Sequence, residues 1–153
     1  MANTYTQIFI QYVFAVQDRH CLINTLWKDE LNRYLIGIID YHGCKVYAIN
    51  GMSDHLHILV SMSPNQSPST LMYEVKRSSS LWINEKKFIK SKFSWQEGFG
   101  AFSYSKSQIS SVAKYIADQE RHHKKTTFME EYKAFLKLYE IDYDERYVFK
   151  PIS

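Results

Sequence analysis

Hydrophobic residues change their spacing several times along the 153-residue chain, and each spacing predicts a different element. Between positions 8 and 16, β-branched and aromatic residues fall on both faces of an extended chain, as in a central strand. From Asn24 onward, apolar residues recur at helical spacing, which predicts a helix that ends near Gly43. Residues 45–50 predict a second strand, and residues 51–53 a turn.

The turn leads into an apolar run at positions 54–60 that contains two histidines. If the run is a strand, its two-residue period places His55 and His57 on one face and the apolar residues on the other. The strand at 45–50 and this histidine strand, joined by the turn at 51–53, then predict a hairpin. Two parallel imidazoles form half of a metal site, although buried or surface histidines without a metal are common.

Further helix starts are marked by capping residues. Ser67 followed by Pro68 predicts a helix start, with serine as the N-cap and proline in the first helical position. The segment 105–108 reads as a capping box before a second apolar helix. Thr127 and Glu130 form another box, which predicts a final helix from there.

Between these helices, residues 86–100 show no clear period and predict a loop, and residues 101–104 predict a short strand. The resulting order is strand, helix, strand, strand, helix, strand and two helices. This order predicts one α+β domain over residues 1–153. Its expected fold is a ferredoxin-like split βαβ sandwich, with an antiparallel sheet, helices on one face and additional C-terminal helices.

Composition narrows the class of protein without identifying it. Hydrophobic residues make up 45% and charged residues 23%, which is typical of a globular domain. The net charge of +3 is compatible with a nucleic-acid partner, and the many aromatic residues suit packing or base stacking. The polar N-terminus, the two widely spaced cysteines and the lack of a long apolar run predict a cytoplasmic protein without a membrane segment.

The helix that starts after Ser105 carries a polar row beside its apolar stripe. We expect this helix to continue to His123, so Tyr115 and Gln119, four residues apart, share one side, and His122 falls on the same side. The helix can therefore pack by one face and present a phenol, an amide and an imidazole along its edge, which makes it a candidate active-site helix. Packing and solvation remain alternative roles for Tyr115 and Gln119.

Three stretches of the chain resemble the single-tyrosine transposases of small bacterial insertion sequences, within the HUH endonuclease superfamily. HUH stands for histidine, a bulky hydrophobic residue and histidine, which His55-Leu56-His57 satisfies. The stretches are Asn50-Gly51-Met52-Ser53-Asp54-His55-Leu56-His57, Trp95-Gln96-Glu97-Gly98-Phe99-Gly100-Ala101-Phe102 and Tyr115-Ile116-Ala117-Asp118-Gln119-Glu120-Arg121-His122-His123. Their order and spacing match the family over nearly the whole chain.

The resemblance implies a role for each of four residues. His55, His57 and Gln119 are the expected ligands of a divalent metal, and Tyr115 is the expected nucleophile on the C-terminal helices. The family is thought to work with Mg²⁺ or Mn²⁺, and nitrogen ligands favour Mn²⁺. The implied reaction cuts single-stranded DNA through a 5′-phosphotyrosine and rejoins it. The implied partners are single-stranded DNA with hairpin ends and a second copy of the chain in a homodimer.

Other residues receive weaker assignments. Asp54 is a candidate to orient a histidine, and His122 is a candidate base for the tyrosine. Basic residues on the second helix and the following segment are candidate phosphate contacts, although each could equally be a solvated charge. These candidate DNA-binding residues are Lys76, Arg77, Lys86, Lys87, Lys90 and Lys92.

Three other functions fit parts of the same pattern. A related HUH endonuclease could serve the host by processing chromosomal repeat hairpins with the same site residues. A binding module could hold structured nucleic acid without cutting it. A hydrolase that uses metal-activated water would leave Tyr115 without a chemical role.

Overall fold

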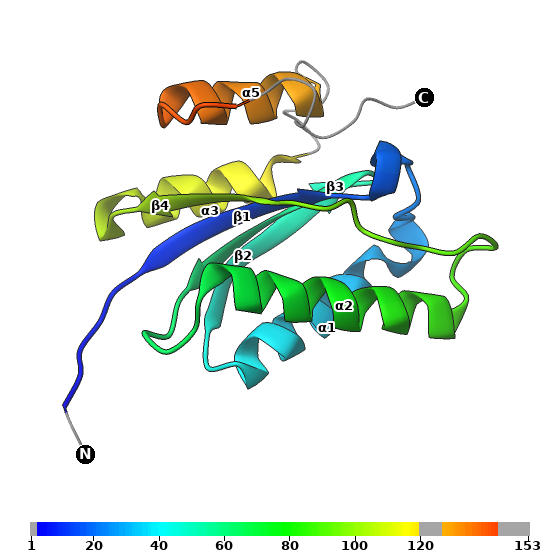
Figure 1. Ribbon diagram of the computed structural model, residues 1–153, viewed down its shortest axis with the longest axis horizontal. Helices are drawn as coiled ribbons and strands as arrows, with labels where there is room; N and C mark the ends of the chain where they lie inside the picture. The colour runs from blue at the N-terminus through cyan, green and yellow to red at the C-terminus, as the bar shows by residue number, and fades with distance from the viewer. Residues whose placement is uncertain (1–2, 120–126, 144–153) are drawn as a thin grey trace.

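The computed structural model describes residues 3–119 and 127–143, and its elements follow the order that the sequence predicts (Figure 1). The strands are β1 (Phe9–Ala15), β2 (Lys45–Met52), β3 (His55–Ser61) and β4 (Gly100–Tyr104). The α-helices are α1 (Thr25–Tyr41), α2 (Pro68–Lys86), α3 (Ile109–Ala117) and α5 (Phe128–Leu138). Short 3-10 helices lie at η1 (Gln17–Arg19) and η2 (Lys106–Gln108).

The four strands form one antiparallel sheet in the order β2-β3-β1-β4. This is the strand order of the split βαβ arrangement, so the predicted fold is confirmed. β1 and β3 occupy the centre, which explains why nearly every residue of both strands is buried. The two histidines therefore lie on a rigid central strand.

Helices cover both faces of the sheet (Figure 1). The face that carries Leu56, Ile58 and Val60 packs against α1 and α2 in the largest apolar cluster. On the opposite face, α3 packs near Leu59 and α5 packs near Val13. The expected split of β3 into a histidine face and an apolar face is confirmed, and the histidine face points toward α3 and α5.

Most predicted element starts match the structure because each has a local capping group. The Ser67 side chain accepts a hydrogen bond from the Thr70 amide, and Thr127 and Glu130 complete a capping box at α5. The predicted turn at 51–53 differs: β2 continues to Met52, and the chain turns at Ser53 and Asp54. A register shift between Val46 and Ala48 accompanies the longer strand.

No helix within the described ranges 3–119 and 127–143 combines the length and the apolar character needed to cross a membrane.

Gly51 allows β2 to approach β3 closely beside the histidines. A Cβ atom at this position would lie 2.1 Å from the His55 carbonyl oxygen and 2.8 Å from the Leu56 Cα. Both contacts are with backbone, so a side-chain rotation cannot relieve them. The Lys28 ammonium also donates a hydrogen bond to the Gly51 carbonyl, at 2.8 Å. The hairpin therefore requires glycine here.

Gly51→Ala is expected to lower the free energy of unfolding by about 1–3 kcal/mol, as overpacked substitutions do. Urea denaturation measures this change. Gly37→Ala is the matched control, because a Cβ at Gly37 on α1 would meet no atom within 4 Å apart from the nearby backbone of its own helix. Alanine is also the better helix former, so the control is expected to gain up to about 1 kcal/mol. Equal stabilities for the two variants would contradict this account of Gly51.

Candidate metal and nucleophile site

β3 places the two histidines side by side in the sheet, facing α3 and α5. His55 pairs with Ala15 and Met52, and His57 pairs with Val13 and Asn50. Both side chains are fully buried, and their rings meet edge to face with centroids 5.3 Å apart. The strand period thus brings two imidazoles together in a solvent-free position.

Each histidine is fixed through its Nδ1 atom. His55 Nδ1 lies 2.7 Å from an Asp54 carboxylate oxygen, and His57 Nδ1 lies 2.8 Å from the Gln11 amide oxygen. The Gln11 amide nitrogen in turn donates to the Tyr104 hydroxyl at 2.8 Å. Both Nδ1 atoms face an acceptor, so we place the proton of each neutral imidazole on Nδ1. This leaves the lone pair of each Nε2 free to bind a metal. The predicted contact between Asp54 and a histidine is present.

Two further acceptors converge on these Nε2 atoms. The Gln119 amide oxygen lies 3.4 Å from His55 Nε2, and a Glu131 carboxylate oxygen lies 2.9 Å from His57 Nε2. The same carboxylate oxygen lies 3.9 Å from His55 Nε2. Lone pairs that face each other at such distances need a proton or a cation between them.

These side chains form a candidate metal site. The ligand atoms of His55, His57 and Glu131 lie within 4.8 Å of one another, and all three residues are buried. Two imidazole nitrogens with carboxylate and amide oxygens suit a divalent ion such as Mn²⁺. The sequence predicts an uncharged ligand set, whereas the structure adds the carboxylate of Glu131.

Tyr115 lies beside this cluster, two residues before the end of α3. Its hydroxyl donates a hydrogen bond to the second carboxylate oxygen of Glu131, and its ring centroid is 6.2 Å from that of His57. Burial raises the pKa of Tyr115 far above its usual value, and the adjacent Glu131 raises it further. Phenolate formation is therefore disfavoured in this arrangement.

The structure brings together all four residues to which the resemblance gives a chemical role. It differs from the expectation in one respect: α3 ends at Ala117, so Gln119 lies beyond the end of α3 rather than on one continuous helix with Tyr115. The Asp118 amide still donates to the Lys114 carbonyl, which closes the last turn. His122, the candidate base, lies outside the described residues.

Sequence reasoning missed Glu131. This carboxylate is on the buried face of α5 together with Phe128, Tyr132 and Leu136, and only 5% of the residue is exposed. Its position in the sequence could have revealed it. Residues three and four apart share a helix face, and Glu131 falls on the apolar face of α5. Acidic residues are rarely buried without a partner, so such a position indicates a site.

The candidate DNA-binding residues lie on α2 and on the segment that follows it. The Lys76 ammonium donates hydrogen bonds to the carbonyls of Gln96 and Gly98, at 2.9 and 2.5 Å. Burial lowers the pKa of Lys76 to about 8. Lys76 thus anchors the segment after α2. The other candidate residues in this region are Arg77, Lys86, Lys87, Lys90 and Lys92, and their DNA contacts stay predictions.

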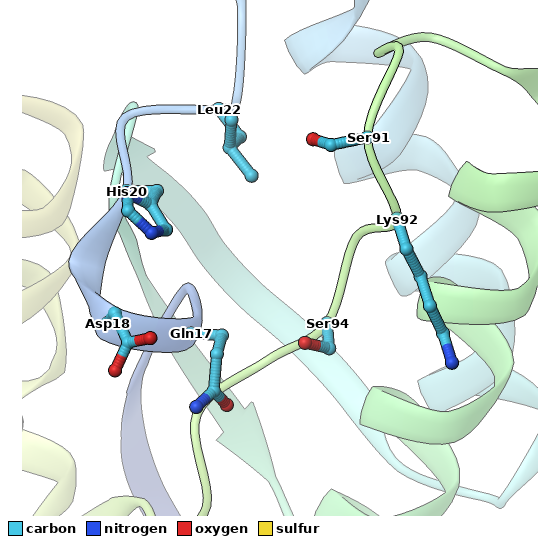
Figure 2. A pocket seen from close by; sticks show the side chains of 7 residues that line it. All are labelled: Gln17, Asp18, His20, Leu22, Ser91, Lys92 and Ser94. Carbon is cyan, nitrogen blue, oxygen red and sulfur yellow. The ribbon is translucent and has the colours of Figure 1, made fainter.

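A polar cavity of about 390 Å³ opens at the end of β1, just beyond the residue that pairs with His55 (Figure 2). The backbone amide of Gln17 donates a hydrogen bond to the backbone carbonyl of Ser94, at 3.0 Å, and so joins the two segments that line the cavity. The volume is within the range of small-ligand sites. Its lining residues are Gln17, Asp18, His20, Leu22, Ser91, Lys92 and Ser94.

Gln11→Leu is expected to weaken Mn²⁺ binding about 10- to 100-fold, because it removes the acceptor that orients His57. Isothermal titration calorimetry measures the affinity, and a thermal melt verifies that the variant is folded. Gln7→Leu, at an exposed position before β1, is the matched control. Unchanged affinity in Gln11→Leu would show that His57 needs no orienting partner.

Comparison with known proteins identifies the family and the fold. The family model described as "Transposase IS200 like" matches residues 4–119. A candidate transposase from Deinococcus radiodurans R1 superposes with a TM-score of 0.63 at 18% identity, covering 78% of this chain and 95% of that one. A REP-associated tyrosine transposase bound to a REP hairpin gives a TM-score of 0.60 at 14% identity, covering 80% and 73%. No curated protein matches significantly. Because the family model spans most of the sequence, the chain belongs to the IS200-like family of HUH tyrosine transposases.

Proposed function

We propose that this protein cuts and rejoins single-stranded DNA through a covalent bond to Tyr115, with the help of a divalent metal. The observation that carries the proposal is the convergence of nucleophile and ligands on one carboxylate. Glu131 accepts a hydrogen bond from Tyr115 through one oxygen and approaches His57 Nε2 with the other. Tyr115 and His57 Nε2 are therefore close enough for one phosphate to contact both the nucleophile and the metal ligands.

The proposed metal holders are His55 and His57 through Nε2 and Gln119 through its amide oxygen, with Glu131 as a further oxygen ligand in the DNA-free protein. When bound, Mg²⁺ or Mn²⁺ supplies positive charge that polarises the phosphate and stabilises the departing oxygen. Asp54 and Gln11 hold the imidazoles in position, so little rearrangement is needed at the moment of reaction.

In the first step, the Tyr115 oxygen attacks phosphorus and loses its proton. The bond from phosphorus to the 3′ oxygen breaks, and that oxygen leaves as a 3′-hydroxyl after taking up a proton. The new 5′-phosphotyrosine bond retains the free energy of the broken one. A different 3′-hydroxyl then attacks it, restores the tyrosine hydroxyl and joins the strands without ATP.

The substrate and assembly remain proposals drawn from the family. The family resemblance supports hairpin-forming single-stranded ends as the substrate, and the hairpin bound to the REP-associated relative is consistent with it. The family also supports a homodimer. The proposed phosphate contacts are Lys76, Arg77, Lys86, Lys87, Lys90 and Lys92, and such contacts weaken as salt increases.

Labelled DNA tests the proposed reaction. Single-stranded oligonucleotides that tile the DNA flanking the gene are incubated with the protein and Mn²⁺, then separated on a denaturing protein gel. A label on the 3′ side of the break is expected to migrate with the protein, whereas a 5′-side label is expected in a free fragment with a 3′-hydroxyl. Cleavage without any covalent adduct would favour a hydrolase, and binding without cleavage would favour a binding module.

A further inference from the structure

α5 covers the candidate site in this structure. It lies over the face of the sheet that carries the histidines (Figure 1). The ring of Phe128 stacks on His55 with centroids 4.1 Å apart and planes 19° from parallel. His55, His57 and Gln119 are all fully buried. A DNA strand cannot reach buried ligands unless the cover moves.

The Glu131 carboxylate lies between Tyr115 and His57, where the proposed reaction would place a phosphate. A phosphorus atom under attack must lie next to the Tyr115 oxygen and present an oxygen to the metal ligands. One Glu131 oxygen contacts Tyr115 and lies 3.4 Å from the Gln119 amide nitrogen, and the other lies 2.9 Å from His57 Nε2. The carboxylate thus makes, with two oxygens, the contacts expected of a phosphodiester.

We propose that Glu131 occupies the scissile-phosphate position in DNA-free protein, and that single-stranded DNA displaces α5 to enter. This inference rests on the proposed function. Two anions cannot share one buried position, because charge repulsion and volume both oppose it. Glu131 is a ligand of the closed site only, and the phosphodiester replaces it in the open one.

Two features make α5 suitable as a removable cover. The family match ends at Gln119, so the two histidines, Tyr115 and Gln119 lie within it and α5 lies beyond it. The helix also carries its own capping box at Thr127 and Glu130, which satisfies its first amides without help from the sheet. Its hold on the sheet comes mainly from apolar side chains, including Leu136.

Two neighbouring glutamates of α5 give a matched test. Glu131→Gln removes the competing charge, whereas Glu130→Gln removes the same charge at an exposed position and keeps a capping acceptor. Affinity for a fluorescent single-stranded oligonucleotide is measured by anisotropy in EDTA, where no cleavage occurs. We expect Glu131→Gln to bind about 10-fold more tightly than Glu130→Gln, because the binding-competent state becomes more populated.

Leu136→Ala provides a second variant that leaves every candidate ligand in place. It loosens α5 through an apolar contact, so its DNA affinity is also expected to rise about 10-fold. In the unmodified protein, hydrogen exchange over residues 128–138 is expected to accelerate when DNA binds. Slower exchange there, with no affinity gain in either variant, would overturn the proposal, because α5 would then remain part of the DNA-bound site.

The two proposals can fail separately. If the covalent adduct forms but DNA binding leaves α5 protected, only the displacement of α5 is wrong. If α5 opens on DNA binding but no adduct forms, the displacement holds and the strand-transfer proposal is wrong.

Discussion

Tyr115→Phe is expected to abolish the covalent adduct and to reduce strand joining by about 10⁴-fold or more, because it removes the attacking oxygen. The ring is retained, so its packing near His57 and Phe135 is preserved. The Glu131 carboxylate loses one hydrogen bond, whereas the imidazoles keep their partners at Nδ1. Mn²⁺ affinity, measured by calorimetry, is therefore expected to change little. The expected loss of adduct and of strand joining therefore reflects the missing nucleophile and not a change in folding.

Tyr73→Phe is the matched control for this experiment. Tyr73 is 63% exposed on α2, so the loss of its hydroxyl is expected to leave the adduct and the melting temperature unchanged. Gel quantification of the adduct and of the free DNA fragments compares the two variants. Cleavage that persists undiminished in Tyr115→Phe would eliminate the tyrosine mechanism and favour attack by water.

His57→Ala is expected to reduce Mn²⁺ affinity by more than about 100-fold and to suppress adduct formation with it. It removes a candidate ligand, which is a larger loss than that of an orienting residue. It also deprives two buried groups of a partner, the Gln11 amide oxygen and the Glu131 carboxylate. Metal-free stability is expected to fall by about 1–3 kcal/mol or more for that reason.

Calorimetry with Mn²⁺ and urea denaturation in EDTA separate these two effects. His42→Ala serves as the control, because His42 lies at the end of α1 and its ring contact is with Tyr41. If His57→Ala retained full metal affinity, the metal would be held by other residues. If it lost stability but kept affinity, His57 would be structural.

Residues close in sequence allowed most of the fold to be predicted. The alternation at His55 and His57 fixes the face of β3, and the caps at Ser67 and Thr127 fix helix starts through contacts within three residues. The end of α3 was harder to predict, because helical spacing continues through residues 118–123 in the sequence although the helix stops at Ala117. Asp118 leaves helical geometry, with φ −94° and ψ 20°, and periodicity does not report such a break at a single residue.

The candidate site was predictable only where the family pattern extends. His55, His57, Tyr115 and Gln119 have recognisable spacing, and the structure brings them together. Glu131 and Gln11 carry no such spacing, because their contacts with His57 join positions 74 and 46 residues away. Contacts over such distances are set by the pairing of β1 with β3 and by the packing of α5 on the sheet, which sequence periodicity does not report.

The close approach at Gly51 affects how a mutational scan of this protein would be interpreted. A scan scored only by transposition would place Gly51 in the same class as the metal ligands, because any side chain there pushes β2 away from the backbone of His55. Gly51 nevertheless offers no functional group to DNA or metal. Stability measured together with activity would separate Gly51 from the nucleophile, because a Gly51 variant loses both, whereas Tyr115→Phe loses activity alone. Metal affinity would separate Gly51 from His57, because His57→Ala also loses stability but removes a candidate ligand.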